Sequence, residues 1–243
     1  MCDTCGCGDP AIVPVELQHS LLADNDRRAR HNRVHLRADG VFSLNLMGSP
    51  GSGKTALLEA TAARWSGGSR LAALSGDLAT DRDAARLRAA GIPSLAITTG
   101  SACHLDARMV HDALHDLPLE GRDVLFIENV GNLVCPAIYD LGQERNVVLV
   151  SVTEGEDKPL KYPPMFRRAD LVVVTKLDLL PLLPEFQLDL LRENLAHVMP
   201  EPACIALSAR SGEGLDAWLR WLENARVETS GPRAVAEPAA QQP

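Results

Sequence analysis

Residues 41–55 read "VFSLNLMGSPGSGKT", a stretch in which a short apolar run leads directly into a glycine-rich loop. The residues that follow, "ALLEATAARW" at 56–65, have the composition of a helix. The loop fits the pattern G-x-x-x-x-G-K-[ST] through Gly48, Gly53, Lys54 and Thr55. A strand, such a loop and a helix in this order predict a phosphate site, because backbone N–H groups close around the anion and the helix N-terminus adds its dipole. The alternative is an ordinary glycine turn.

The residue types of this loop predict distinct roles. Lys54 is expected to bridge the β- and γ-phosphates and to act in catalysis, and the Thr55 hydroxyl is expected to bind Mg²⁺. The residues predicted to contact the nucleotide here are Gly48, Gly51, Ser52, Gly53, Lys54, Thr55 and Ala56.

Further apolar runs follow the first, each ending in a glycine or a polar cluster and each followed by a helical segment. They lie at 70–77, 94–100, 123–131, 146–153, 170–178 and 203–209. Strands that are apolar along their whole length are covered on both faces, which is typical of a parallel sheet. Strands that alternate with helices indicate an α/β fold. We therefore expect a P-loop NTPase with a mostly parallel seven-stranded sheet flanked by helices.

The composition changes along the chain and predicts four parts. Residues 1–14 are expected to form a flexible cysteine-rich tether that binds metal, and residues 15–36 an N-terminal helical extension. Residues 37–227 are expected to form the P-loop domain, and residues 228–243, rich in Pro, Ala and Gln, a disordered tail.

The composition and net charge of the sequence argue against several classes of function. With 243 residues, 46% of them hydrophobic, the chain can fill a core without a metal or a disulfide. A net charge of −8 argues against nucleic-acid or anionic-membrane partners. No apolar run approaches the roughly 18 residues that span a bilayer, and no signal peptide is recognisable. These features favour a cytoplasmic protein with reduced cysteines.

The base of the nucleotide is predicted by two later segments. "VVVTKLD" places Thr175, Lys176 and Asp178 at a strand end, in the order [NT]-K-x-D. A carboxylate there accepts the ring N1–H and the exocyclic amine of guanine, which adenine does not offer. "ALSAR" at 206–210 is expected to present a backbone N–H to guanine O6 through Ser208 and Ala209. The prediction is GTP, with a capped turn or a P-loop small-molecule kinase as alternatives.

Carboxylates at strand ends are also needed for Mg²⁺ and for the attacking water. "LSGD" offers Asp77 and "IENVG" offers Glu128, with Gly131 three residues later. The second stretch fits a D-x-x-G switch in which Glu replaces Asp, so the Gly131 N–H would sense the γ-phosphate. No glutamine stands beside Gly131 to position water, which predicts slow intrinsic hydrolysis. A helix cap or a simple turn is the alternative for each carboxylate.

Several longer stretches resemble HypB, a family of accessory GTPases that help to insert nickel into [NiFe]-hydrogenase. They are "GSPGSGKT", "GDLATDRDAARLRAAGIP", "TTGSACHLDA", "FIENVGNLVCPA", "VTEGEDKPLKYP" and "VVTKLDLLP". The resemblance covers roughly residues 35–225. It implies GTP hydrolysis, a GTP-dependent homodimer and nickel delivery, with other hydrogenase maturation proteins and the hydrogenase large subunit precursor as partners. Service to another enzyme such as urease, or passive nickel or zinc buffering with a vestigial nucleotide site, are the alternatives.

Three thiols open the chain, at Cys2, Cys5 and Cys7. A glycine-containing loop lets their sulfurs converge on one soft or borderline metal ion. A redox C-x-x-C, a structural zinc knuckle and incidental cysteines are the alternatives. "CDTCGCG" resembles the nickel motif of one HypB subgroup, and this resemblance favours Ni²⁺ over Zn²⁺.

A second metal site is predicted from Cys103, His104 and Cys135. The first two are expected to open a helix after a strand, and Cys135 lies four residues beyond Gly131. The family resemblance implies a nickel or zinc site at the dimer interface; packing cysteines and a capping histidine are the alternative. His111 and His115 have chelate spacing, but with no third ligand evident they are interpreted as a solvated helix face.

Overall fold

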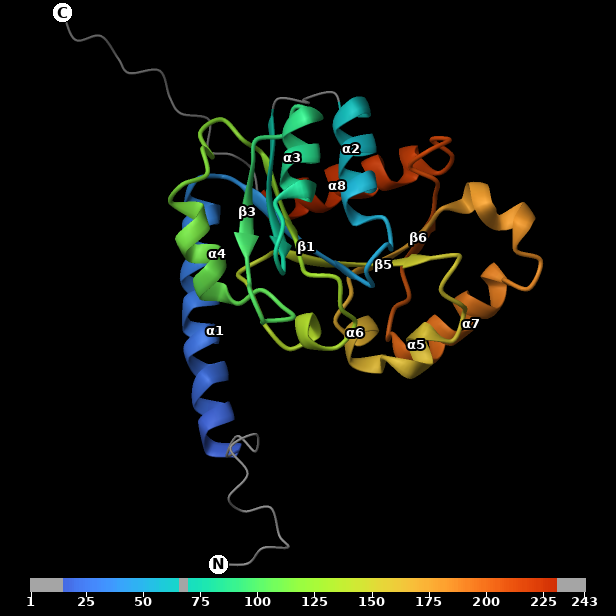
Figure 1. Ribbon diagram of the computed structural model, residues 1–243, viewed down its shortest axis with the longest axis horizontal. Helices are drawn as coiled ribbons and strands as arrows, with labels where there is room; N and C mark the ends of the chain where they lie inside the picture. The colour runs from blue at the N-terminus through green and yellow to red at the C-terminus, as the bar shows by residue number, and fades with distance from the viewer. Residues whose placement is uncertain (1–14, 66–69, 231–243) are drawn as a thin grey trace, which may run out of the picture.

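The structure, a computed structural model, describes residues 15–65 and 70–230 (Figure 1). Residues 1–14, 66–69 and 231–243 lie outside that description, and with them the predicted cysteine tether and most of the predicted tail. Within the described residues, no helix combines the length and the apolar character needed to cross a bilayer.

The predicted seven strands are present and form one sheet. All of its pairings are parallel, so the sheet is more uniform than the predicted mostly parallel arrangement. The strand order is β3-β2-β4-β1-β5-β6-β7. The strands are β1 (Phe42–Gly48), β2 (Leu71–Asp77), β3 (Ser94–Thr98), β4 (Val124–Glu128), β5 (Arg145–Ser151), β6 (Leu171–Thr175) and β7 (Cys204–Ala206).

Helices cover both faces of the sheet (Figure 1). One face packs against α2 (Lys54–Arg64), α3 (Arg82–Ala89) and α8 (Leu215–Ser230). The other face packs against α1 (Val15–Ala38), α4 (Ala107–Leu114), α6 (Pro163–Arg167) and α7 (Leu188–Val198), with the short α5 (Lys158–Lys161) beside α7. Two 3₁₀ turns, η2 (Cys135–Ala137) and η3 (Leu177–Leu182), follow β4 and β6.

The central strands are buried along their length, which explains their continuous apolar sequences. Every residue of β1, β4 and β6 is buried. Because all strands run in parallel, the loops that leave their carboxyl ends gather at one edge of the sheet. In an open α/β sheet this edge, beside the central strand, is where ligands bind.

The N-terminal extension packs on the rest of the domain. Asn32 of α1 is fully buried, and its amide donates to the carbonyl oxygens of Ala107 and Leu141 at 2.8 and 3.1 Å. Arg33 forms an ion pair with Asp140 at 2.8 Å. The polar sequence of α1 therefore reflects hydrogen bonds to the domain. At the other end, α8 continues to Ser230, three residues beyond the predicted boundary at residue 227 between the domain and the tail.

Candidate functional site

The loop between β1 and α2 approaches the neighbouring strand closely. A Cβ atom at Gly48 would lie 2.6 Å from the carbonyl oxygen of Leu149, so no larger residue fits there. Gly53, which caps α2, has a φ of 97°, a left-handed conformation that favours glycine. The geometry therefore requires the glycines of the phosphate motif.

Lys54 turns back over this loop. Its Nζ donates to the carbonyl oxygens of Gly48 and Ser49 at 3.4 and 3.3 Å, and the side chain is almost fully buried. Burial lowers the pKa of Lys54, and the nearby Glu128 carboxylate opposes that shift. The ammonium group thus lies inside the loop, where a phosphate would replace the two carbonyl partners.

Thr55 and Glu128, which lie 73 residues apart in the sequence, meet at the carboxyl end of β4. The Thr55 hydroxyl donates to Glu128 Oε1 at 2.7 Å. Ser75 Oγ lies 3.5 Å from the other oxygen of the Glu128 carboxyl group. Burial raises the pKa of Glu128 from 4.5 to about 7, and the bond from Thr55 partly opposes this. A buried carboxyl beside a threonine hydroxyl suits a hard cation such as Mg²⁺.

Asp77 ends β2 on the same side of the sheet. Its Oδ1 accepts hydrogen bonds from the backbone N–H groups of Ala79 and Thr80, both at 2.9 Å, and these bonds lower its pKa. The carboxylate is therefore ionised and held by its own loop.

These groups line one pocket of about 430 Å³. It contains Lys54, Thr55, Asp77, Glu128 and Gly131, together with Gly51, Gly53 and Ala56 of the loop. The sequence prediction missed Asp83 and Arg86, which also line this pocket from α3. Arg86 pairs with Glu59 of α2 at 2.6 Å, a contact that no motif indicates.

The residues predicted for the base lie where β6 and β7 end. Asp178 Oδ1 accepts a hydrogen bond of 2.5 Å from the Ser208 hydroxyl. Ser208 Oγ in turn accepts from the backbone N–H groups of Arg210 and Ser211, which shapes the turn after Ala209. The two predicted segments are thus joined, and Ser208 orients the carboxylate.

The motif assigns Thr175 to the base of the nucleotide, but its side chain contacts the phosphate loop. Its hydroxyl donates to the carbonyl oxygen of Ser52 at 2.6 Å, and the side chain is buried. Thr175 therefore holds the phosphate loop against β6, while Lys176 follows it in a left-handed conformation with a φ of 63°.

The segment after β4, residues 129–135, is hereafter the switch loop. At Gly131 a Cβ atom would lie 2.8 Å from the backbone nitrogen of Pro50, so the switch loop touches the phosphate loop. Asn132 pairs with Gly48 in an isolated antiparallel bridge, and its N–H donates to the Gly48 carbonyl at 3.0 Å.

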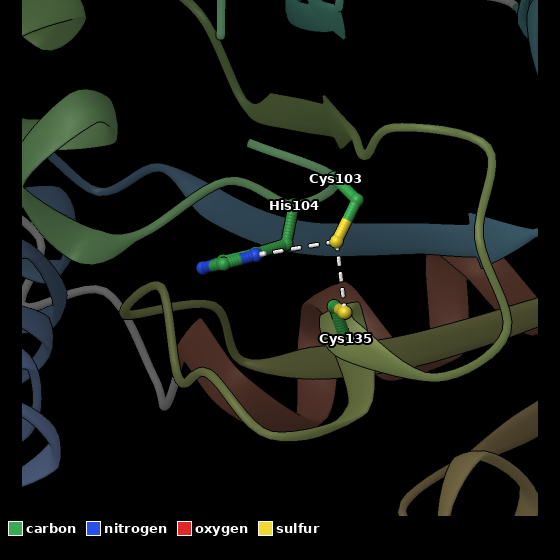
Figure 2. Close-up of side chains that lie close together, drawn as sticks. All are labelled: Cys103, His104 and Cys135. Carbon is green, nitrogen blue, oxygen red and sulfur yellow. Dashed lines mark hydrogen bonds between the residues drawn. The ribbon is translucent and has the colours of Figure 1, made fainter. Parts of the chain in front are cut away.

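The switch loop places Cys135 beside Cys103 and His104, which completes the second predicted metal site (Figure 2). Cys103 Sγ lies 2.8 Å from Cys135 Sγ and 3.9 Å from His104 Nδ1. The three ligand atoms lie within 4.8 Å of one another, and both cysteines are free thiols. Two thiols and an imidazole form a donor set for Zn²⁺ or Ni²⁺.

One detail of that prediction is wrong. Cys103 and His104 lie in the loop after β3 and do not open a helix, because α4 begins at Ala107. Asp106 caps α4 by accepting a hydrogen bond from the Met109 N–H at 2.8 Å. The strong N-cap residue sets the helix start, so the two ligands stay on the preceding loop.

The surroundings of the cluster favour the neutral form of its imidazole. The His104 ring stacks on Tyr139 with centroids 4.0 Å apart. Burial lowers the pKa of His104, while the hydrogen bond with the Cys103 thiol raises the pKa of Cys135. Metal binding would displace the thiol protons, because the ligand form of cysteine is the thiolate.

Asn132 joins the cluster to the phosphate loop. Its backbone bonds to Gly48, while its side-chain amide donates to the Cys103 carbonyl at 3.3 Å. The side-chain oxygen of Asn132 accepts from the Val134 N–H at 2.9 Å. One residue thus contacts the phosphate loop and the loops carrying both cysteines, which sequence reasoning did not identify.

Comparison with known proteins assigns the family. Residues 42–205 match the family described as CobW/HypB/UreG, nucleotide-binding domain. The hydrogenase maturation factor HypB of Azotobacter chroococcum is 50% identical over 214 residues, which cover 87% of this chain and 69% of that relative. The chain belongs to the HypB family. HypB of Escherichia coli K12 is also 50% identical, over 212 residues that cover 87% of this chain and 73% of the relative.

The solved structures agree with this assignment. A crystal structure of HypB from Helicobacter pylori in complex with nickel matches with a TM-score of 0.81 and 40% identity, covering 86% of this chain and 98% of that one. The fold of this HypB-family chain is therefore that of a nucleotide-binding hydrogenase maturation factor. The predicted Cys2, Cys5 and Cys7 site lies outside the described residues.

Proposed function

We propose that this chain is a cytoplasmic nickel-binding GTPase that hydrolyses GTP to GDP and phosphate and delivers nickel during the maturation of [NiFe]-hydrogenase. The observation that carries the proposal is the contact of Asn132 with both Gly48 and Cys103. Through Asn132, the phosphate site and the thiol–imidazole metal site both contact the switch loop.

Guanine is favoured as the base. The Asp178 carboxylate is oriented by Ser208 through Oδ1, and both of its oxygens keep lone pairs for the ring and amine N–H groups of guanine. Mg²⁺ would be held by Thr55, Asp77 and Glu128, and it would neutralise charge on the β- and γ-phosphates. Hydrolysis is expected to be slow, because Asn132 follows Gly131 and its amide is already bonded to the Cys103 carbonyl.

Nickel is favoured as the cargo, which would be held by Cys103, His104 and Cys135. The HypB of Helicobacter pylori is described as a complex with nickel, and the donor set here also suits zinc. Two apolar residues close to Cys135, Val134 and Ile138, are exposed. A second copy that covers them in the GTP-bound state would form the expected homodimer.

Hydrogenase rather than urease is favoured as the destination, because the relatives of 50% identity bear the name hydrogenase maturation factor. Cys2, Cys5 and Cys7 would supply a further nickel site. Other maturation proteins and the hydrogenase large subunit precursor are the proposed partners.

Substitution of Lys54 tests the proposed active site. GTP turnover should fall by about 100-fold or more in the Lys54→Ala variant, since the positive charge that would stabilise the transition state is removed. Lys161→Ala is the matched control, because Lys161 is an exposed lysine paired with Asp157, and its turnover should stay within about two-fold. Phosphate release from GTP and from ATP is the readout. Unchanged GTP turnover in Lys54→Ala would refute the site, and equal turnover of ATP would refute the base assignment.

A further inference from the structure

Two helices that are far apart in the sequence bring four histidines together. α1 and α4 lie side by side (Figure 1). α1 carries His31 and His35, and α4 carries His111, with His115 at its C-cap, so each presents a pair four residues apart on one face. The ring centroids of His31 and His111 are 5.1 Å apart, and those of His111 and His115 are 4.8 Å apart. The sequence showed no third ligand for His111 and His115, and the structure places His31 of α1 beside His111.

The spacing of the α4 pair is that of two ligands on one ion. His111 Nε2 and His115 Nε2 face each other at 3.3 Å. Two imidazole nitrogens bound to one tetrahedral Zn²⁺ at about 2.0–2.1 Å lie about 3.3–3.4 Å apart, with ring centres about 5 Å apart. The His31–His111 and His111–His115 centroid distances, 5.1 and 4.8 Å, both match the expected separation of ring centres. His35 lies farther out, 6.4 Å from the His115 ring, and its Nε2 is 3.4 Å from Asp39 Oδ2.

Asn32 prepares His111 for this role. The Asn32 amide nitrogen donates to the carbonyls of Ala107 and Leu141, so its oxygen must face His111 Nδ1, 3.1 Å away. An oxygen accepts only from an N–H, so the proton of neutral His111 is on Nδ1. The lone pair is therefore on Nε2, the atom directed at His115. A ligand histidine whose other nitrogen donates to an oxygen is the usual arrangement at protein metal sites.

The charge around the cluster favours neutral imidazoles. Burial lowers the pKa of His111, and the neighbouring His115, His31 and Arg28 act in the same direction, while Asp112 opposes them. A pocket of about 340 Å³ opens beside His31 and His111, and its other lining residues are Asp24, Arg27 and Arg28. The nitrogens of His31 do not yet converge with the α4 pair, since in the described part of the chain only the Cys103 cluster brings three ligand atoms within 4.8 Å. His31 is exposed, so its ring is free to turn toward the pocket.

We propose that His31, His111 and His115 bind one divalent cation of the kind that imidazole favours, Zn²⁺ or Ni²⁺, and that this ion joins α1 to α4. The site is separate from the thiol cluster and does not depend on nucleotide. Its preference follows from its all-imidazole donor set, which suits zinc, nickel and copper rather than Mg²⁺ or Ca²⁺.

The test uses the full chain with Cys2, Cys5, Cys7, Cys103 and Cys135 replaced by serine, which removes the thiolate sites. Equilibrium dialysis against Zn²⁺ and against Ni²⁺ at about pH 7.5, where imidazole is neutral, should show one bound equivalent. His115→Gln and His31→Gln should each weaken it by about ten-fold or more, since each removes one ligand. His197→Gln is the matched control, because His197 is exposed on α7 and bonds only to the Glu193 carbonyl. It should leave the affinity unchanged.

Two further measurements keep the test decisive. Metal should raise the thermal midpoint of the serine background and not that of its His115→Gln form, because the ion binds only when both helices are packed. In the chain with all its cysteines, His115→Gln should lower the total bound metal by one equivalent. No bound equivalent in the serine background, or equal affinity in all the histidine variants, would overturn the proposal. His111 and His115 would then simply share a hydrogen bond.

Discussion

At the residue scale, Glu128 places a carboxyl group in the buried centre of the nucleotide pocket. Its pKa is raised to about 7 by burial, whereas in the unfolded chain it ionises near 4.5. Between these values the folded state keeps a proton that the unfolded state loses, so stability falls as pH rises through this window and then levels off. The charge is held there at a cost to stability, as is common at functional sites.

The Glu128→Gln variant tests this directly. In nucleotide-free protein with EDTA, the variant should match the wild type near pH 4, below the unfolded pKa, and be more stable above pH 7. The gap should reach the order of 3 kcal/mol, from a pKa rise of 4.5 to about 7. Urea unfolding at four pH values spanning roughly 4 to 8 measures it. A stability difference that does not change with pH would contradict the assigned pKa.

The Asp178→Asn variant tests the base at the same scale. It exchanges an acceptor for a group that donates to the O2 of xanthine. GTP binding should weaken by about 100-fold, since two hydrogen bonds to a charged group are lost, and xanthosine triphosphate should now bind. The Ser208 hydroxyl, which donates to the Asp178 carboxylate, can donate equally to the amide oxygen of the variant, so the turn is kept. Competition binding with both nucleotides is the readout, and an unchanged preference for GTP would exclude Asp178 from base recognition.

At the scale of elements, the switch loop lies against the phosphate loop with no space for a side chain at Gly131. Gly131→Ala places a Cβ atom against the Pro50 backbone, so the switch loop must move away from the γ-phosphate position. Affinity for a GTP analogue should fall about ten-fold, because one hydrogen bond to a charged group is lost, while affinity for GDP stays within a few-fold. Fluorescence titration with labelled nucleotides distinguishes the two. Equal loss for both nucleotides would mean that Gly131 only supports the fold.

The elements themselves were largely predictable. Each strand of the sheet coincides with a predicted apolar run, apart from Arg145 at the start of β5, because burial on both faces leaves a signal in local sequence. The start of α4 was misplaced, because the residue that caps the helix, Asp106, lies after His104 rather than before Cys103. The contacts of Asn32 and Asn132 were not predictable, because each joins segments from 29 to 109 residues apart through side-chain amides. Periodicity carries no information on such pairs.

At the scale of the whole molecule, the parallel sheet gathers the nucleotide loops and the cysteine cluster at one edge, while the histidine cluster lies on α1 and α4. Residues at the phosphate loop and at the Cys103 cluster share the switch loop through Asn132. If the switch loop changes shape with the γ-phosphate, nucleotide and metal must affect each other's binding by the same factor. This reciprocity is the basis of the proposed mechanism.

The most direct test compares metal affinity at the Cys103 cluster with GDP and with a non-hydrolysable GTP analogue. The protein carries serine at Cys2, Cys5 and Cys7 and Gln at His115, so that the other proposed metal sites do not contribute. Ni²⁺ and Zn²⁺ affinities should differ by about ten-fold between the two nucleotides, the usual size of coupling between sites. Cys135→Ala should weaken the metal and remove the difference, and Cys204→Ala, whose thiol lies in β7 away from the cluster, should keep it. Identical metal affinity with GDP and with the GTP analogue would contradict the proposed coupling between the two sites.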